Sequence, residues 1–465
     1  MKLRSIGVVF ILFCAVTMVE AGPRNVLLLV SDNQNQSDCG CYGNPVVQTP
    51  NIDRLASEGV RFADAFATTA SCGPSRAVLY TGLYTHANGQ YGHGHAAHTF
   101  HLRPGVQTVF QLLKQAGYHT ALLGKQHVSP PEQYPFTFDP RVDGRDVMGL
   151  AEAGGEFIRG AGDEPFFLTI GYSDPHPTSR EGWGFRKEYD GVTPVRYDPA
   201  EVIVPSWLPD QPEVREGLAG YYQQITRMDE GVGRILEILE ESGKADDTLV
   251  IFTSDHGSSE PGAMANHYEP GVRVPFIVRR AGNTKVGTTN SAMITFVDVK
   301  PTILDWCGVK PRKPLHGRSF LPILDDENPV GWDEVYLDHC FHEVTMYYPM
   351  RTLRNRRYKL IWNIAWRLEF PHPIDTLQRD TWTKLIARGD EFLGKRRIQD
   401  FLFRDEYELY DLQADPEEVV NLASDPAYSE IRREMAAQID AISRATDDPW
   451  MERHTIPSDD FGRHQ

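Results

Sequence analysis

Two continuous apolar runs, each followed by a carboxylate, constrain the fold of this chain most strongly. Residues 25–30 (Asn-Val-Leu-Leu-Leu-Val) precede a serine and Asp32, and residues 248–253 (Thr-Leu-Val-Ile-Phe-Thr) precede a serine and Asp255. Runs without polar alternation are typical of strands buried on both faces of a parallel sheet. Because open α/β sheets bind ligands outside the carboxyl ends of their strands, we expect both carboxylates to lie at a ligand site.

The rest of the chain predicts an α/β fold in two parts. A long amphipathic stretch at 221–239 indicates a helix that covers the core. After about residue 330 the sequence predicts short strands rich in basic and aromatic residues, followed by an amphipathic helix. We expect a large mixed, mostly parallel sheet sandwiched by helices within residues 22–345. A smaller C-terminal α+β subdomain with an antiparallel sheet is expected within residues 346–465.

The N-terminus predicts export. Lys2 and Arg4 open the chain, an apolar run follows at residues 6–19, and Ala21 ends a short small-residue site. This order is typical of a secretory signal peptide, here residues 1–21, and it predicts a secreted or periplasmic protein. A membrane anchor is the alternative, but the apolar run is short for a span.

The net charge of the chain limits the partners that it can bind. The chain has 47 Lys and Arg against 64 Asp and Glu, a net charge of −17, which argues against nucleic acid as a partner. An anionic substrate would need a local cationic pocket.

Five cysteines follow the predicted signal peptide, an odd number that fits a reserved role for Cys72. The other four can pair in an oxidising compartment, with the connectivity open: Cys39, Cys41, Cys307 and Cys340.

Residues 68–76 (Thr-Thr-Ala-Ser-Cys-Gly-Pro-Ser-Arg) predict an extended chain, a tight turn and the start of a helix. Pro74 suits the first turn of a helix, where its missing N–H costs nothing. Cys72 would then lie at the positive end of that helix, where an anion is favoured. The alternative for such a cysteine is a small buried hydrophobe.

The Cys-x-Pro-Ser-Arg pattern, with Thr81 and Gly82 just downstream, resembles the signature of the sulfatase family. The resemblance implies an alkaline-phosphatase-like fold. It also implies that a formylglycine-generating enzyme converts Cys72 to formylglycine, an aldehyde whose hydrate is the nucleophile. Arg76 of the same motif would help to neutralise the group being transferred.

The same resemblance implies a divalent cation, held by Asp32, Asn33, Cys72, Asp255 and His256. Ca²⁺ is the expected ion, with Mn²⁺ and Mg²⁺ as alternatives. Asn33 departs from the second aspartate of the family; its amide oxygen can bind a hard cation but brings no charge. His256 favours a somewhat softer ion.

Two further phrases resemble family signatures. Residues 124–127 (Gly-Lys-Gln-His) supply Lys125 as a cation for the sulfate oxygens and His127 as a base. His176 stands between two prolines, where the family carries the histidine that protonates the leaving group. Each residue alone could be solvated surface or an ordinary loop residue. By contrast, we expect the Gly-His alternation at 91–95 to be a flexible loop rather than a metal site.

The substrate is expected to be a sulfated carbohydrate, with a homodimer possible. Phrases at 134–139, 302–306 and 342–351 resemble the heparan N-sulfatase branch of the family, which acts on N-sulfoglucosamine. The basic residue that many sulfatases use to grip sulfate falls here near Met264, so a neighbouring histidine or arginine is expected instead. The predicted substrate-binding residues are Asp174, His267, Arg273, His342 and Glu343.

Three alternatives stay open. His342 and Glu343 could serve hydrogen bonding at a domain interface rather than a sugar pocket. Asn33 and His256 allow a phosphodiesterase or phosphonate monoester hydrolase of the same superfamily. An unmodified Cys72 would leave a non-catalytic protein that binds sulfated glycans.

Overall fold

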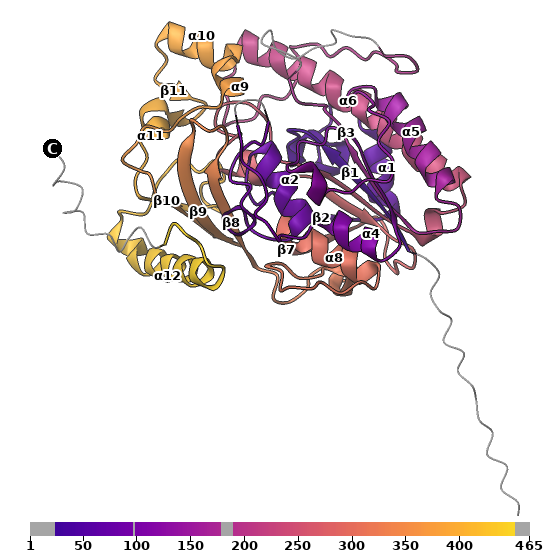
Figure 1. The fold of residues 1–465 in the computed structure, drawn as a ribbon. Helices are drawn as coiled ribbons and strands as arrows, with labels where there is room; N and C mark the ends of the chain where they lie inside the picture. Colours follow the sequence, from indigo (N-terminus) through magenta and orange to yellow (C-terminus); the bar gives the residue numbers. More distant parts are fainter. Residues whose placement is uncertain (1–23, 96–97, 178–188, 452–465) are drawn as a thin grey trace, which may run out of the picture.

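The computed structural model describes residues 24–95, 98–177 and 189–451, and a seven-stranded sheet forms its centre (Figure 1). The strand order is β3-β4-β1-β5-β6-β2-β7. Only β6 runs antiparallel to its neighbours β5 and β2 within this sheet, so the predicted mixed, mostly parallel sheet is confirmed. Its strands are β1 (Asn25–Ser31), β2 (Val60–Phe66), β3 (His119–Gly124), β4 (Phe166–Gly171), β5 (Thr248–Ser254), β6 (Phe276–Arg279) and β7 (Thr288–Thr295).

The two apolar runs form the adjacent central strands β1 and β5. Every residue of both strands is buried, as expected for strands that are covered on both faces. The parallel register pairs Ser31 with Ser254. Asp32 and Asp255 therefore leave the sheet side by side at the same edge.

Helices cover both faces of this sheet (Figure 1). On one face, α1, α5 and α6 pack against Leu27 and Leu29. On the other, α2, α4 and α8 pack against Leu28 and Val30. Full burial of one such side chain contributes about 1.5–3 kcal/mol, so this alternation holds the helices to the sheet. The bounds are α1 (Pro50–Glu58), α2 (Cys72–Thr81), α3 (Thr85–Asn88), α4 (Val109–Gln115), α5 (Val147–Gly160), α6 (Pro212–Glu241), α7 (Glu269–Val272) and α8 (Val299–Trp306).

The C-terminal part carries a separate antiparallel sheet of order β13-β10-β9-β8. Met435 and Ile439 of α12 pack on one face of it, and α10 and α11 cover the other. The predicted division of the chain between residues 345 and 346 stays a prediction. The bounds are β8 (Glu334–Phe341), β9 (Tyr347–Asn355), β10 (Tyr358–Asn363), β11 (Phe392–Leu393), β12 (Arg396–Arg397), β13 (Tyr407–Asp411), α9 (Ile374–Leu377), α10 (Asp380–Arg388), α11 (Ile398–Leu402) and α12 (Ser429–Ala445).

Strand β8 of the smaller sheet holds the segment that leads into α2. The amide of Asp338 donates to the carbonyl of Thr68 (3.1 Å). The hydroxyl of Thr69 bonds Nδ1 of His339 (2.8 Å). The C-terminal sheet thus fixes the chain just before Cys72.

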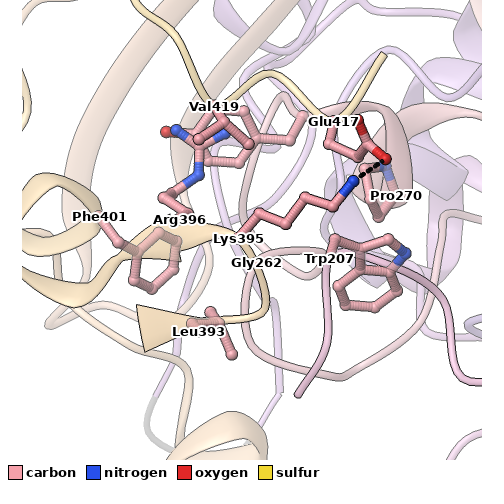
Figure 2. A pocket seen from close by; sticks show the side chains of 10 residues that line it. Trp207, Gly262, Pro270, Leu393, Lys395, Arg396, Phe401, Glu417 and Val419 are labelled. Carbon is pink, nitrogen blue, oxygen red and sulfur yellow. Dashed lines mark hydrogen bonds and ion pairs between the residues drawn. The ribbon is translucent and has the colours of Figure 1, made fainter. Parts of the chain in front are cut away.

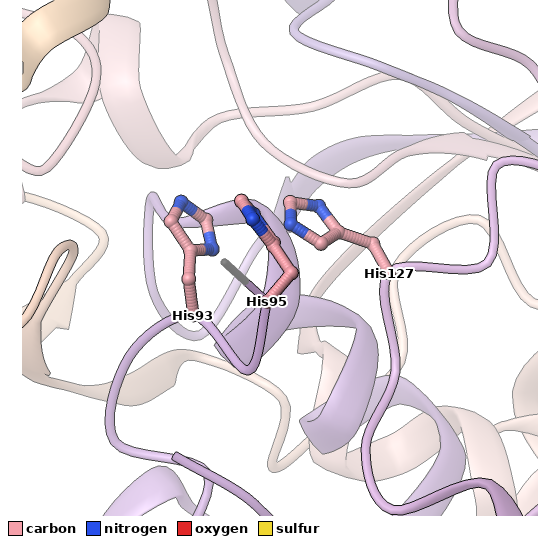
Figure 3. A group of neighbouring side chains, drawn as sticks. All are labelled: His93, His95 and His127. Carbon is pink, nitrogen blue, oxygen red and sulfur yellow. The ribbon is translucent and has the colours of Figure 1, made fainter. Parts of the chain in front are cut away.

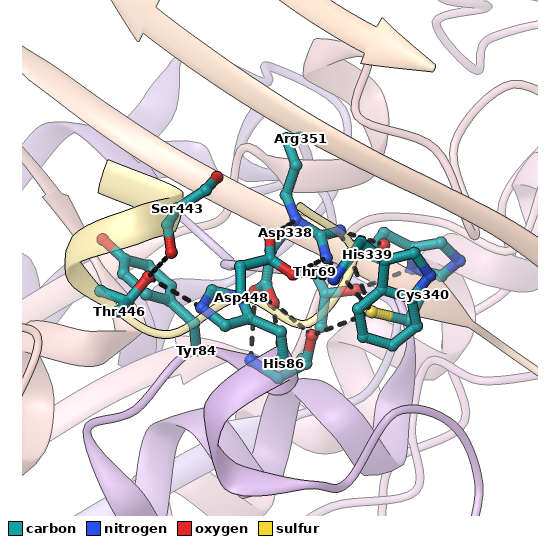
Figure 4. A network of polar contacts seen from close by, with 12 residues as sticks. Thr69, Tyr84, His86, Asp338, His339, Cys340, Arg351, Ser443, Thr446 and Asp448 are labelled. Atoms are coloured by element: carbon teal, nitrogen blue, oxygen red, sulfur yellow. Dashed lines mark hydrogen bonds and ion pairs between the residues drawn. The ribbon is translucent and has the colours of Figure 1, made fainter. Parts of the chain in front are cut away.

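A buried polar network links Thr446, just after α12, to helix α3 and strand β8 (Figure 4). The carboxylate of Asp338 accepts from the amide and from Nδ1 of His86, each at 2.9 Å. Nε2 of His86 bonds the hydroxyl of Thr446 at 2.9 Å. Beside them, Arg351 and Asp448 form a two-pronged ion pair that is fully buried.

The predicted signal peptide, residues 1–21, lies outside the described residues. Within the described part of the chain, no helix combines the length and the apolar character that a membrane span requires. All five cysteines there are free thiols, so the structure pairs none of those whose connectivity was open.

Candidate active site

Helix α2 begins at Cys72, as the turn pattern predicts. Ser71 before it is extended, with φ −148° and ψ 124°, and Pro74 falls in the first turn. All ten residues of the helix are buried, and Cys72 is 2% exposed. Burial raises the pKa of the Cys72 thiol well above its ordinary value.

Three hydrogen-bond acceptors surround the sulfur of Cys72. Sγ lies 3.2 Å from Nε2 of His256, 3.7 Å from Oδ1 of Asp32 and 3.8 Å from Oδ1 of Asn33. Nδ1 of His256 donates to the carbonyl of Gly257 (2.8 Å), which leaves a lone pair on Nε2. One S–H group can satisfy only one of these acceptors.

These side-chain atoms therefore form a set of ligands that fits a divalent cation. Asp32 and Asn33 supply the oxygen ligands that a hard cation prefers, and His256 adds an imidazole nitrogen. Potential ligand atoms of Asp255, Cys72 and His256 lie within 4.8 Å of one another. The structure thus brings all five predicted cation ligands together at one edge of the sheet.

Two cations stand beside this cluster, the buried Arg76 and the half-buried Lys125. Nε of Arg76 donates to Oδ2 of Asp255 at 3.0 Å, and Nη2 lies 3.8 Å from Oδ2 of Asp32. The ammonium of Lys125 pairs with the carboxylate of Asp32. Burial opposes ionisation of Asp32, but Lys125, His176 and Arg76 together hold its pKa well below the usual range. Arg76 and Lys125 supply the local positive charge that an acidic chain needs to attract an anion.

His127 and His176 offer ring nitrogens to the same space. A ligand atom of His176 lies within 4.8 Å of those of Asp32 and Cys72. Both ring nitrogens of His127 are buried without a hydrogen-bond partner in the described structure. Burial, reinforced by Lys125, lowers the pKa of both imidazoles, so the free rings are neutral near pH 7.

A cavity gives access to Lys125 and His127. Its volume is about 370 Å³, and its lining is Gly94, His95, Lys125, Gln126, His127 and Val128. A monosaccharide-sized group fits a space of this order.

The structure gives Asp174 the role of an anchor. Its two carboxylate oxygens bind Arg227 at 2.6 and 2.8 Å, and one also binds Arg145 at 2.5 Å. Its carbonyl accepts from the amide of Asp32 (3.0 Å), and Arg145 also donates to the carbonyl of His176 (2.8 Å). Asp174 therefore helps to position Asp32 directly and His176 through Arg145. Both of its carboxylate oxygens are already bonded to arginines.

His342 contacts the segment that leads into Cys72, whereas Glu343 contacts α9. Nδ1 of His342 bonds the hydroxyl of Ser71 (2.9 Å), one residue before Cys72, and the side chain is buried. Glu343 is half-buried, and its carboxylate accepts from the amide of Ile374 at the start of α9 (3.2 Å).

His267 and Arg273 lie elsewhere. Nδ1 of His267 bonds the hydroxyl of Thr352 (2.7 Å), and Arg273 pairs with Asp64 (3.0 Å) and Glu269 (3.7 Å). Arg273 lines a separate cavity of about 340 Å³. That cavity shares three residues with the narrow pocket of Figure 2: Trp207, Pro270 and Glu417.

Sequence reasoning missed three side chains around the site. His93 and His95 approach His127, although the Gly-His alternation predicted only a flexible loop. Asp375 of α9 is the third. Burial lowers the pKa of His95 and His176, and the charge of Asp375 acts in the opposite direction on both. The Gly-His alternation was the one available signal, and nothing in the sequence singles out Asp375.

Comparison with protein families gives two matches. Residues 24–309 match the family model described as Sulfatase. Residues 264–370 match the model described as N-sulphoglucosamine sulphohydrolase, C-terminal.

Two similar proteins span nearly the whole chain. Human N-sulphoglucosamine sulphohydrolase is 36% identical over 94% of this chain and 94% of its own length. An ulvan-active sulfatase of Formosa agariphila is 29% identical over 91% of this chain and 80% of its own length.

Solved structures share the fold at lower identity. A protein solved in complex with its substrate D-glucosamine-2-N,6-O-disulfate superposes with a TM-score of 0.68 and 22% identity, covering 92% of this chain and 99% of that one. The phosphonate monoester hydrolase of Agrobacterium radiobacter gives a TM-score of 0.69 and 21% identity, with 91% and 96% covered.

Proposed function

Because this chain belongs to the sulfatase family, we propose that it hydrolyses the sulfamate or sulfate ester of a sulfated sugar, with N-sulfoglucosamine as the preferred unit. The identity to the human sulphohydrolase over nearly the full chain supports this substrate. So does the match of residues 264–370, which include His342 and Glu343, to the C-terminal model of that enzyme. The observation that carries the proposal is the position of Cys72, beside three potential cation ligands and next to the positively charged Arg76 and Lys125.

The proposed nucleophile is formylglycine made from Cys72 by a formylglycine-generating enzyme. Once formed, its hydrate would supply one hydroxyl, its proton lost to water, as the nucleophile toward sulfur, and a second hydroxyl whose deprotonation would break the carbon–oxygen bond to sulfate and restore the aldehyde. A bound divalent cation, Ca²⁺ foremost, would supply positive charge that favours the ionised hydroxyl. Asp32, Asn33, Asp255 and His256 would hold that cation.

The remaining steps use side chains of this chain. Arg76 and Lys125 face the cluster and stabilise the negative charge that grows on the sulfate oxygens. His176 gives a proton to the departing amine or alcohol. Its free ring is neutral, and the charge of a bound sulfate favours its protonation. His127, whose ring nitrogens have no other partner within the described residues, takes the proton of the second hydroxyl.

The location and the partners follow from the same proposal. We propose that residues 1–21 are a signal peptide and that the mature protein works outside the cytoplasm, where sulfated carbohydrates are available. A homodimer stays a prediction.

One preparation tests the substrate. Release of sulfate from N-sulfoglucosamine and from glucosamine 6-sulfate is compared with hydrolysis of a phenylphosphonate monoester, for the wild type and for Cys72→Ala. We expect the highest kcat/KM for N-sulfoglucosamine and background rates for the variant. Turnover that survives Cys72→Ala would refute the nucleophile.

The second candidate is a phosphonate monoester hydrolase. Asn33 favours it, because an uncharged amide replaces a carboxylate in the cation site. A kcat/KM for the phosphonate above that for every sulfated sugar tested would establish it instead.

A further inference from the structure

We infer that His93, His95 and His127 form a second metal site, selective for a borderline-soft divalent cation such as Zn²⁺, and that its occupancy switches the enzyme off. One ring nitrogen from each histidine lies within 4.8 Å of the others. Figure 3 shows the three imidazole rings gathered from the 93–95 loop and from the segment after β3. The ring centroids are 4.4–5.0 Å apart.

The histidine cluster and the cation site at Cys72 differ in the ligand atoms that they offer. The first site mixes carboxylate and amide oxygens with a single imidazole, which suits a hard ion. The histidine cluster offers only imidazole nitrogens, which suit Zn²⁺, Cu²⁺ or Ni²⁺ and bind Ca²⁺ poorly. Two sites in one protein can therefore select different ions from the same solution.

Unsatisfied nitrogens point to a missing ligand. His93 is 5% exposed, and its Nδ1 has no hydrogen-bond partner in the described parts of the chain. Both nitrogens of His127 share that condition. A buried polar atom without a partner is destabilising, so these three neighbouring nitrogens favour a ligand that can satisfy them.

A supporting contact holds His93 in place. Its Nε2 bonds Nε2 of His342 at 3.1 Å, and His342 in turn bonds Ser71 at 2.9 Å. Metal-binding histidines are commonly held through their other nitrogen in this way, which fixes the ring while one nitrogen stays available.

The geometry requires two adjustments. The ring planes are only 18–35° from parallel, and each imidazole lone pair lies in its ring plane, so the rings of His95 and His127 must turn relative to His93 to face one ion. Zn–N distances of about 2.0–2.1 Å require the three nitrogens to move closer together. His95 is the exposed member of the cluster and belongs to a segment without helix or strand, so it can close on the other two. The cavity of about 370 Å³ beside His95 and His127 has room for a water as the fourth ligand.

Occupancy would block catalysis for two reasons. The metal would take the lone pair of His127 that the proposed function assigns to proton removal, and it would sit at the entrance to Lys125. Only this inhibitory consequence rests on the proposed function. Metal binding itself does not.

The test uses the full-length protein saturated with Ca²⁺. Zn²⁺ is titrated by calorimetry and, separately, into the activity assay, with each variant normalised to its own zinc-free rate. The variants are His93→Gln and His95→Gln. His101→Gln is the matched control, an exposed histidine six residues beyond His95 in the same segment.

We expect the wild type and His101→Gln to bind one Zn²⁺ with micromolar affinity or better and to lose activity in parallel. Loss of one of three ligands in His93→Gln or His95→Gln should weaken Zn²⁺ binding at least tenfold and shift inhibition equally. Unchanged Zn²⁺ affinity in both variants, or no binding to the wild type, would overturn the site. Binding without inhibition would overturn the switch. If no substrate is turned over, the calorimetry still decides the site, and equal Ca²⁺ affinity shows that each variant is folded.

Discussion

The sulfur of Cys72 lies 3.2 Å from Nε2 of His256, although 184 positions separate the two residues in the chain. The parallel register of β1 with β5 brings His256 to the edge of the sheet, and β8 fixes the segment that leads to Cys72. The reactive residue thus depends on both sheets, and changes in either part of the chain should affect it.

Replacement of Lys125 by alanine should lower kcat about 10²–10³-fold, the cost of removing one donor to a charged transition state. Its ammonium is paired with Asp32 and lines the access cavity. Steady-state kinetics with N-sulfoglucosamine measures the loss. The exposed Lys114→Ala on α4 is the control, since it removes the same charge from a residue outside the cavity lining, and its kcat should stay within a few-fold of wild type. Equal losses in the two variants would speak against a direct role for Lys125.

Replacement of Asn33 by aspartate should tighten Ca²⁺ binding at least tenfold. A unit charge 4 Å from another contributes about 4 kcal/mol at an effective dielectric constant of 20, well above the roughly 1.4 kcal/mol of a tenfold change, even after repulsion from Asp32. The φ of Asn33 is 68°, a conformation that aspartate also tolerates. Calcium titration of the chelator-treated protein provides the measurement.

The exposed Asn328→Asp changes the net charge equally and should leave Ca²⁺ affinity unchanged. An Asn33→Asp protein with wild-type affinity would remove Asn33 from the ligand set.

Replacement of Asp338 by asparagine should destabilise the protein by about 3 kcal/mol or more, because a buried carboxylate then no longer serves His86 and Thr85. Burial opposes ionisation of Asp338, but its bonds to His86 and the charge of Arg351 hold its pKa well below the ordinary value. The carboxylate's contribution is therefore fully present above about pH 4 and is lost as the pH falls further.

Urea unfolding at pH 7 and at progressively lower pH should accordingly show a gap between wild type and Asp338→Asn that shrinks below about pH 4. Asp333→Asn is the control: Asp333 pairs with Arg356 at the surface, where such a pair contributes about 1 kcal/mol or less. A gap independent of pH would mean that the charge of Asp338 is not what stabilises the network.

The positions of Asp32 and Asp255 could be predicted because a buried parallel strand leaves a clear apolar run and its next residue must emerge at the sheet edge. The start of α2 at Cys72 was predictable from local turn chemistry. The partners of Asp174 were not, because Arg145 and Arg227 lie 29 and 53 positions away on other elements. The approach of His93 to His127 likewise depends on loop packing, which has no periodic signal in the sequence.

The mass of the tryptic peptide 62–76, taken from a catalytically active preparation made in the native host, tests the central claim most directly. An aldehyde at position 72, trapped by a hydrazine reagent, is the predicted result. An active preparation in which that peptide carries only an alkylatable thiol would contradict it.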